Sequence, residues 1–310
     1  MSDPSHIVDS DTNDALWQSG NACSLTDLRE ALECRAQTGN PMVGFILPRA
    51  NLEGINLVRP NARQGYQLID SDLYRANLKN AHCFKLDFSG SSLMKADFEY
   101  ANLHCANLKG CNLLGTKFKH AKIEQVEWGE EILQEQQARE AETHEAAMDL
   151  YEQAEEVYRH LRKVCEDQGL FENAGRFFQK EMIMRRMQLP YISFKRLISK
   201  IVDLFCGYGE QPLRVIIFSL LVILSFATLY FFAGLSFSGE SLGFKTHLSI
   251  RENVHAFLSS LYFSVVTFTT LGYGDLAPIG IARGFAALEA FIGSFTLALF
   301  VVVFVKKMTR

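Results

Sequence analysis

An apolar or small side chain recurs at every fifth position over a long central stretch of the chain. The recurring residues are Leu68, Leu73, Leu78, Cys83, Phe88, Leu93, Phe98, Leu103, Leu108, Leu113, Phe118, Ile123 and Trp128. A second, mostly small residue stands two places earlier, at Ala76, Ala81, Ser91, Ala96, Ala101, Ala106 and Ala121. Neither the alternation of a strand nor the turn of an α-helix produces a period of five. The period therefore excludes both as the structure of this stretch.

The repeated units, such as A-N-L-K-N and A-D-F-E-Y, resemble the pentapeptide-repeat family. The resemblance implies a right-handed quadrilateral β-helix over residues 44–129, with one repeat on each side and the Leu/Phe and small positions pointing inward. Leu47, Leu52 and Leu57 follow the same period one residue out of register, which predicts an insertion near residues 59–65. Residues 44–128 carry eleven Lys/Arg against eight Asp/Glu. This balance disfavours the DNA mimicry of acidic family members, and the alternating charges disfavour a nucleic-acid patch.

The average composition, 48% hydrophobic with a net charge of −4, hides a difference between the two halves of the chain. Ionisable residues are sparse after residue 214, where two long apolar runs lie. Val215–Leu235 has no charge, and Gly284–Val305 has only Glu289. Each run is long enough for a helix to cross about 30 Å of hydrocarbon. We therefore expect two membrane-spanning helices, at about 213–235 and 282–305, in a membrane domain over residues 210–310.

Basic residues flank both runs on their outer sides: Arg185, Arg186, Lys195, Arg196, Lys200 and Arg214 precede the first, and Lys306, Lys307 and Arg310 follow the second. By the positive-inside rule, both termini of this multi-pass protein are expected in the cytoplasm, which places it in the cell membrane (plasma or inner membrane). The polar, acidic N-terminus predicts no cleavable signal. All seven cysteines are then expected as reduced thiols, and no paired CxxC spacing indicates a metal site.

The segment between the two runs, Leu261–Asp275, reads L-Y-F-S-V-V-T-F-T-T-L-G-Y-G-D. It resembles the pore helix and filter of two-transmembrane potassium channels. The resemblance implies a pore helix at about 254–269, a selectivity filter at residues 270–274 and a homotetramer around a row of K⁺ ions. The K⁺ ligands would be the Thr270 hydroxyl and the main-chain carbonyl oxygens of Thr270, Leu271, Gly272 and Tyr273. Turning these carbonyls inward requires backbone angles that glycine reaches without a Cβ penalty, at Gly272 and Gly274.

A second Gly-Tyr-Gly, at residues 207–209, follows Leu-Phe-Cys rather than a Thr pair, and we interpret it as a turn. Within the filter segment, Leu271 stands where valine is commonest in the family. Val266 stands where some bacterial members have a glutamate. Phe263 stands where many relatives carry a tryptophan that hydrogen-bonds the aspartate after the filter. The filter-support residues are therefore expected to be Thr269, Asp275, Tyr262, Phe263 and Glu289, with Tyr262 or water replacing the indole as the partner of Asp275.

The second apolar run contains three residues with candidate roles. Glu289 lies near its outer end, where we expect it to accept hydrogen bonds from the pore helix rather than to contact ions. Gly293 lies near the middle and is a candidate gating hinge, although glycine also serves close helix packing in membranes. Thr296, one turn deeper, is a candidate for lining the water-filled cavity.

Two further segments join the repeats to the first run. Residues 191–209 form a basic amphipathic pattern between Pro190 and Pro212, which resembles the slide helix of inward-rectifier channels and is expected at the membrane interface. A soluble helix packed on the preceding domain is the alternative. Residues 130–190 are expected as a connector of two helices, Glu130–Gln168 and Glu172–Gln188. An apolar seam in the first helix closes either within the subunit or between four subunits: Ala147, Leu150, Ala154, Val157, Leu161 and Val164.

Residues 1–43 are expected as an N-terminal tail and a short helix. The first twenty residues have the composition of a disordered segment. Ser24 and Asp27 are positioned to cap a helix from Leu25 to about Gln37.

The sequence thus predicts a multidomain protein that conducts K⁺ passively, with no cofactor besides K⁺ in the filter. Voltage sensing is not expected, because neither run is rich in arginine. An enzyme is not expected either, because no nucleophile–base constellation or phosphate loop occurs. The role of the repeat domain is open, whether it tunes the pore or binds a cytoplasmic partner or ligand. Two alternatives are a membrane-tethered repeat scaffold with an inactive pore and a non-selective cation channel.

Overall fold

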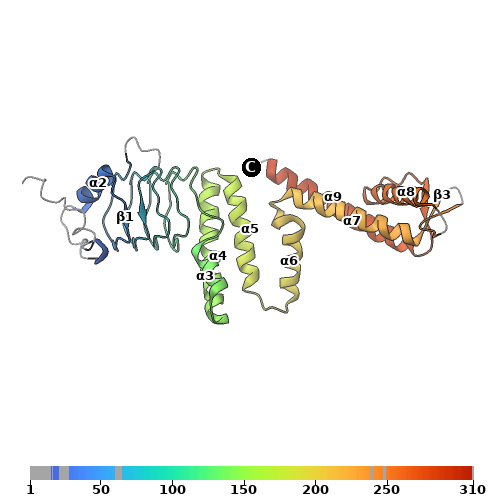
Figure 1. Cartoon of the computed structure of the whole chain (residues 1–310), viewed down its shortest axis with the longest axis horizontal. Coiled ribbons are helices and arrows are strands. Elements are labelled where there is room, and N and C mark those ends of the chain that lie inside the picture. Colours follow the sequence, from blue (N-terminus) through green and yellow to red (C-terminus); the bar gives the residue numbers. More distant parts are fainter. Residues whose placement is uncertain are drawn as a thin grey trace, which may run out of the picture. The chain divides into compact units, whose positions relative to one another are not determined.

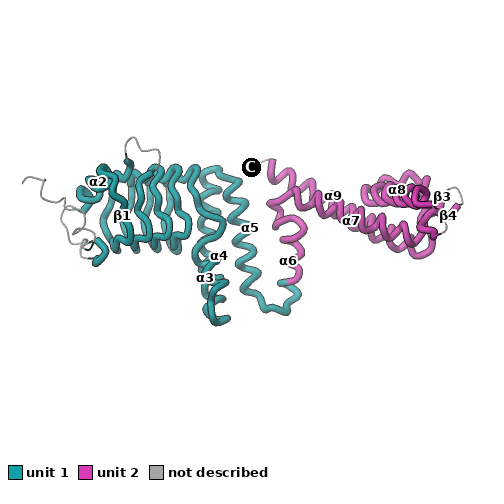
Figure 2. The backbone as a smooth tube through the Cα atoms, viewed as in Figure 1, with its two compact units in different colours: residues 1–196 teal, residues 197–310 magenta. Residues whose placement is uncertain are grey.

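The computed structural model describes residues 15, 17–20, 28–59, 65–237, 240–246 and 249–308 (Figure 1). The chain divides into two compact units, Met1–Arg196 and Leu197–Arg310 (Figure 2). The division falls inside helix α6 (Phe194–Cys206), so each unit is described by itself. The six described cysteines are free thiols, and Cys23 lies outside the described residues.

The five-residue period folds as a coil in which each turn takes four repeats. Parallel bridges join residues twenty apart, such as Asp72 to Ser92 and Asp97 to Lys117. In the first turn the partners are 26 apart, as in Ile46 to Asp72 and in the pairing of β1 (Met42–Val43) with β2 (Leu68–Ile69). The six additional residues account for the register shift of Leu47, Leu52 and Leu57. The predicted insertion itself lies largely in residues 60–64, outside the described residues.

The interior of the coil is a column of the recurring side chains. All thirteen recurring residues are at most 3% exposed, and the small residues between them are buried as well. Aromatic rings pack through the last turns: Phe98 stacks on Phe118 with centroids 5.8 Å apart, and Phe118 meets Trp128 edge-to-face at 5.7 Å. Burying one such side chain contributes about 1.5–3 kcal/mol, so the column is the main source of stability in this unit.

Helix α2 (Leu28–Thr38) packs on the first turn of the coil through Leu28, Leu32 and Ala36. The predicted start at Leu25 and the predicted caps Ser24 and Asp27 lie outside the described residues. The tail differs from the expectation of disorder at Trp17, which is 3% exposed and stacks on Phe45 at 5.3 Å.

The connector contains α3 (Leu133–Glu140), α4 (His144–Asp167) and α5 (Phe171–Met187). The expectation of one helix from Glu130 to Gln168 is wrong, because Ala141 adopts an extended backbone and Thr143 begins a new helix. The Thr143 hydroxyl accepts a hydrogen bond from the Ala146 amide at 3.2 Å, which satisfies one of the free donors at the start of α4. The predicted seam packs inside the chain over most of its length, since Ala154, Val157, Leu161 and Val164 are buried.

The described residues of the second unit form the helices α6 to α9 and a small antiparallel sheet. Helix α6 leads through a tight turn at Gly207–Gly209 into α7 (Pro212–Ala233). The sheet has the order β4-β3-β5, with β3 (Leu235–Phe237), β4 (Glu240–Leu242) and β5 (Leu276–Pro278). Helix α8 (Ile250–Phe268) and helix α9 (Ala282–Met308) complete it. Helices α7 and α9 are long and apolar enough to span a membrane, and α8 begins four residues before its predicted start.

Candidate functional site

The segment after α8 has a backbone that alternates between two conformations. The φ angle is 58° at Thr270, 58° at Gly272 and 79° at Gly274, whereas Leu271 and Tyr273 keep negative φ. Such an alternation turns successive carbonyl groups toward the same side. The two glycines adopt it freely, but a left-handed backbone costs a residue with a Cβ about 1–2 kcal/mol, which Thr270 must bear. The sequence identified the glycines and missed the strain at Thr270.

Hydrogen bonds from the end of α8 hold the start of this segment. The Thr270 amide donates to the Thr267 carbonyl at 3.0 Å, and the Leu271 amide donates to the Val266 carbonyl at 3.0 Å. The Thr269 hydroxyl donates to the Val265 carbonyl at 2.7 Å. By contrast, the carbonyl oxygens of residues 270–273 accept no hydrogen bond from any described residue. The segment thus presents a row of main-chain acceptors whose partners must come from elsewhere.

Tyr262 and Phe263 differ in what they contact. The Tyr262 phenol lies near the Asp275 carboxylate and interacts with it, directly after the row of carbonyls. Phe263 is buried and packs its ring edge-to-face on Tyr230 of α7, with centroids 4.9 Å apart. Of the two partners expected for Asp275, Tyr262 or water, Tyr262 is the side chain that lies near it. Consecutive residues on a helix point about 100° apart, so only one of the two can face the segment.

Glu289 connects three helices. Its carboxylate is fully buried and accepts hydrogen bonds from the hydroxyls of Tyr230, at 2.7 Å, and of Ser264. These three residues lie on α9, α7 and α8, so one acceptor ties both long helices to the helix that carries the segment. The expected bond from α8 is present. Sequence reasoning missed Tyr230 and Ser264, although each is a hydrogen-bonding side chain in an otherwise apolar stretch.

Gly293 and Thr296 both lie where α9 packs against its neighbours. A Cβ built on Gly293 would stand 2.1 Å from the Phe268 carbonyl oxygen and 2.8 Å from its carbon, at the C-terminus of α8. The contact favours the close-packing interpretation of Gly293 over the hinge. Thr296 is 1% exposed and donates its hydroxyl to the Ile292 carbonyl at 2.7 Å. The cavity-lining assignment of Thr296 is therefore wrong, because its side chain is enclosed within one chain.

Charged pairs fix the other end of the second unit. Lys306 near the end of α9 forms an ion pair with Glu210, which follows the Gly207–Gly209 turn. Arg214 at the start of α7 donates to the Asp203 carbonyl of α6 at 2.8 Å. The second Gly-Tyr-Gly is thus a turn that joins α6 to α7 beside the end of α9. Apart from the charges that bound the two apolar runs, no sequence signal could have predicted this pairing.

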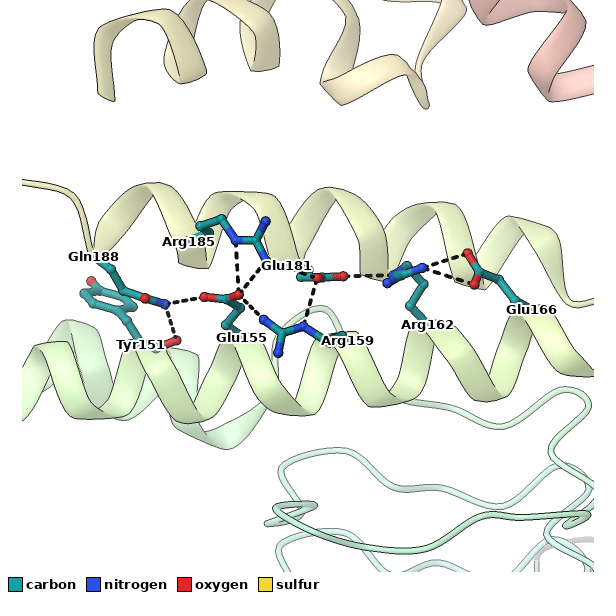
Figure 3. Close-up of polar contacts among 8 residues, drawn as sticks. All are labelled: Tyr151, Glu155, Arg159, Arg162, Glu166, Glu181, Arg185 and Gln188. Atoms are coloured by element: carbon teal, nitrogen blue, oxygen red, sulfur yellow. Dashed lines mark hydrogen bonds and ion pairs between the residues drawn. The ribbon is translucent and has the colours of Figure 1, made fainter. Parts of the chain in front are cut away.

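A second set of charges lies within the connector, between α4 and α5 (Figure 3). Glu155 and Glu181 are 8% and 4% exposed and are hydrogen-bonded by Arg159, Arg162, Arg185 and Gln188. Burial alone would raise the pKa of Glu155, but the hydrogen bonds from Arg185 and Gln188 outweigh it and hold that pKa below its usual range. Glu155 therefore stays ionised, and the pairs lock α4 to α5.

Comparison with known proteins gives two families for this chain. Residues 216–310 match the ion channel family, and residues 71–110 and 91–126 each match the family described as pentapeptide repeats (8 copies). The chain therefore carries an ion-channel domain of the two-transmembrane type together with pentapeptide repeats, in a multidomain layout. An ion-channel domain with two apolar helices makes it a membrane protein, and neither family is an enzyme family. No curated protein matches the chain.

Three crystal structures of pentapeptide-repeat proteins are similar to part of the chain. HetL, involved in heterocyst differentiation regulation in the cyanobacterium Nostoc, is 29% identical over 26% of this chain and 38% of its own, with a TM-score of 0.16. A protein of the Arabidopsis thaliana thylakoid lumen is 24% identical over 32% of this chain and 68% of its own, with a TM-score of 0.17. Rfr23 from the cyanobacterium Cyanothece is 21% identical over 30% of this chain and 85% of its own, with a TM-score of 0.17. At TM-scores this low the likeness does not bear on function.

A prediction concerns Tyr262. Tyr262→Phe keeps the ring and removes only the hydroxyl that interacts with Asp275. Loss of this contact should loosen the segment after α8, so we expect current to run down roughly several-fold faster during sustained opening. Ser259→Ala, which removes an exposed hydroxyl from the same helix, is the matched control and should leave the rate unchanged. Equal run-down in the two variants would mean that the Tyr262 contact does not stabilise the segment.

Proposed function

We propose that this chain is one subunit of a homotetrameric, potassium-selective channel of the cell membrane (plasma or inner), with both termini in the cytoplasm. Residues 270–274 are its selectivity filter. The carbonyl oxygens of residues 270–273 and the Thr270 hydroxyl bind K⁺ in place of water, and no other cofactor takes part. The pore opens without a voltage sensor.

The observation that carries this proposal is the alternation of φ at Thr270, Gly272 and Gly274, together with carbonyls that accept no hydrogen bond from a described residue. An unpaired carbonyl is costly inside a membrane unless it lines a path for water or ions. Four copies of one loop supply enough oxygens to replace the hydration shell of K⁺, and one copy does not. The side chains of Leu271 and Tyr273, 59% and 68% exposed in a single chain, are then covered by neighbouring subunits.

The proposed domains follow the observed elements. Residues 44–129 form a right-handed quadrilateral β-helix, and residues 130–190 form a helical connector. Helix α6 within residues 191–209 lies at the membrane interface, where its exposed Leu197, Ile201 and Leu204 meet lipid. In residues 210–310, α7 and α9 span the bilayer and α8 is the re-entrant pore helix that aims the filter.

The test is ion flux through the purified protein in liposomes. With equal gradients of K⁺ or Na⁺, the full chain should carry K⁺ and exclude Na⁺. Equal flux of both ions would favour a non-selective cation channel. Absence of any flux would favour a membrane-tethered repeat scaffold.

A further prediction concerns the division between the repeats and the pore. A chain beginning at Tyr191 keeps α6 to α9 and every proposed K⁺ ligand. We expect it to form tetramers and to give K⁺-selective flux with an altered open probability, because the repeats bury their own column and fold as a separate unit. Flux that loses its preference for K⁺ over Na⁺ would show that the cytoplasmic part shapes the filter.

A further inference from the structure

A cavity of about 290 Å³ opens between the last turns of the coil and helix α4, within the first unit. Both elements line it. The coil contributes Leu113, Gly115, Thr116 and Lys117, and α4 contributes Glu156, Val157, Arg159, His160 and Lys163. Small-molecule sites usually have volumes of roughly 300–1,000 Å³, so this cavity suits a compact ligand.

The floor of the cavity is apolar. Leu113 and Val157 are 3% and 2% exposed and present only carbon atoms. The Thr116 hydroxyl is turned away, because it donates to the Leu93 carbonyl at 2.8 Å. The floor therefore favours an uncharged part of a ligand.

The rim of the cavity is positively charged. Its ionisable residues other than histidine are Lys117, Arg159 and Lys163, against Glu156 alone. Arg159 is engaged by Glu155 and Glu181 on the side facing α5 (Figure 3). The Lys117 Nζ atom lies 3.4 Å from the Asp97 carboxylate. The Lys117 side chain is 68% exposed, and an ion pair at such an exposed position is weak. Lys163 is exposed, and it forms no ion pair with any described residue. Two lysines from different elements thus remain to attract an anion.

His160 adds a polar group without adding charge. Burial lowers its pKa, and nearby Lys163 lowers it further, against a hydrogen bond to the Thr116 backbone that raises it. The ring is therefore neutral at pH 7, and it stacks on Phe118 with centroids 6.2 Å apart. Its Nε2 atom is buried without a hydrogen-bond partner among the described residues. Buried polar atoms are nearly always paired, so an unpaired one beside a cavity points to a site kept for something other than stability.

We propose that this cavity binds a small organic phosphate. The phosphate lies between the ammonium groups of Lys117 and Lys163, and the remainder of the molecule covers Leu113 and Val157. Lysine binds phosphate as a compact point charge, and two lysines from separate elements fix its position. The bound molecule braces the coil against α4, whose opposite face is locked to α5 by the Glu155 and Glu181 pairs. On the proposed channel function, occupancy then alters open probability; the binding itself does not rest on that function.

The test is isothermal titration calorimetry of the full chain in detergent, with AMP as the probe. We expect saturable binding by the wild type. Lys117→Ala and Lys163→Ala should each raise the Kd about tenfold, the effect of losing one charge-assisted contact. Lys122→Ala removes an exposed lysine of the coil that does not line the cavity, and it should leave the Kd unchanged.

Absence of saturable AMP binding by the wild type would overturn the proposal, as would equal affinities of Lys163→Ala and Lys122→Ala. Inorganic phosphate that binds as tightly as AMP would overturn the organic part of the assignment in favour of the free ion. Because calorimetry needs no current, a failure here is distinct from a failure of the channel proposal. A protein that carries no K⁺ flux but still binds AMP through Lys117 and Lys163 would refute the channel proposal and leave the binding proposal standing.

Discussion

Gly272→Ala is expected to abolish K⁺ flux while the tetramer remains assembled. The φ angle of Gly272 is 58°, where a Cβ costs about 1–2 kcal/mol, and fourfold symmetry repeats that strain in one layer of carbonyls. The sum, about 4–8 kcal/mol per tetramer, adds to the strain that Thr270 already bears in the neighbouring layer, and together they are enough to turn the Gly272 carbonyls away and to lower flux by far more than about tenfold. Flux in liposomes measures the loss, and size-exclusion chromatography measures assembly.

Gly209→Ala is the matched control for this variant. Gly209 has a φ of 83°, and an added Cβ would meet nothing within 4 Å, as at Gly272. Gly207 is less suitable, because a Cβ there would stand 3.0 Å from Gln211 Cγ. The backbone penalty at Gly209 is thus similar but lies outside the filter, so flux should be nearly normal. An equal loss of flux from both variants would mean that backbone strain anywhere in the second unit stops conduction.

Gly293→Ala is expected to have the second largest effect. Its Cβ would stand 2.1 Å from the Phe268 carbonyl oxygen, which is a backbone atom and cannot move aside alone. Overpacking of this kind costs about 1–3 kcal/mol, and α8 must shift at a point two residues before Thr270. We expect a lower Tm of the purified protein together with reduced flux.

Gly284→Ala on the same helix is the control, because a Cβ there would meet nothing within 4 Å. Alanine is the better helix former by about 1 kcal/mol, so this variant should be as stable as the wild type or more so. A hinge at Gly293 makes a different prediction, in which Tm is unchanged and only the open probability shifts. That result would favour the hinge over close packing.

Much of the architecture could be predicted from periods and lengths. A period of five admits few structures, and the shift at Leu47, Leu52 and Leu57 located the longer first turn. The apolar runs placed α7 and α9 within a few residues, and Gly272 and Gly274 marked the backbone alternation. These features are local, so they leave a trace in the order of the residues.

What the sequence could not predict concerns the direction of side chains rather than the position of elements. Whether Tyr262 or Phe263 faces Asp275 depends on the rotation of α8 against α7, which the sequence does not record. Thr296 is enclosed for the same reason, by a rotation of α9. The Glu289 contacts and the cavity at Lys117 and Lys163 join segments at least 25 residues apart, so they exist only in the fold. The break before α4 was the exception, because Thr143 is a recognisable cap.

The central claim is that residues 270–274 select K⁺, and the reversal potential of the full chain in a planar bilayer tests it most directly. With K⁺ on one side and Na⁺ on the other, at equal concentrations, the current should reverse far from zero, toward the potential at which K⁺ alone would be at equilibrium. Gly209→Ala should reverse at the same potential. Reversal near zero, with clear current in both directions, would contradict the claim, because the pore would then pass both ions without regard to the spacing of its carbonyls.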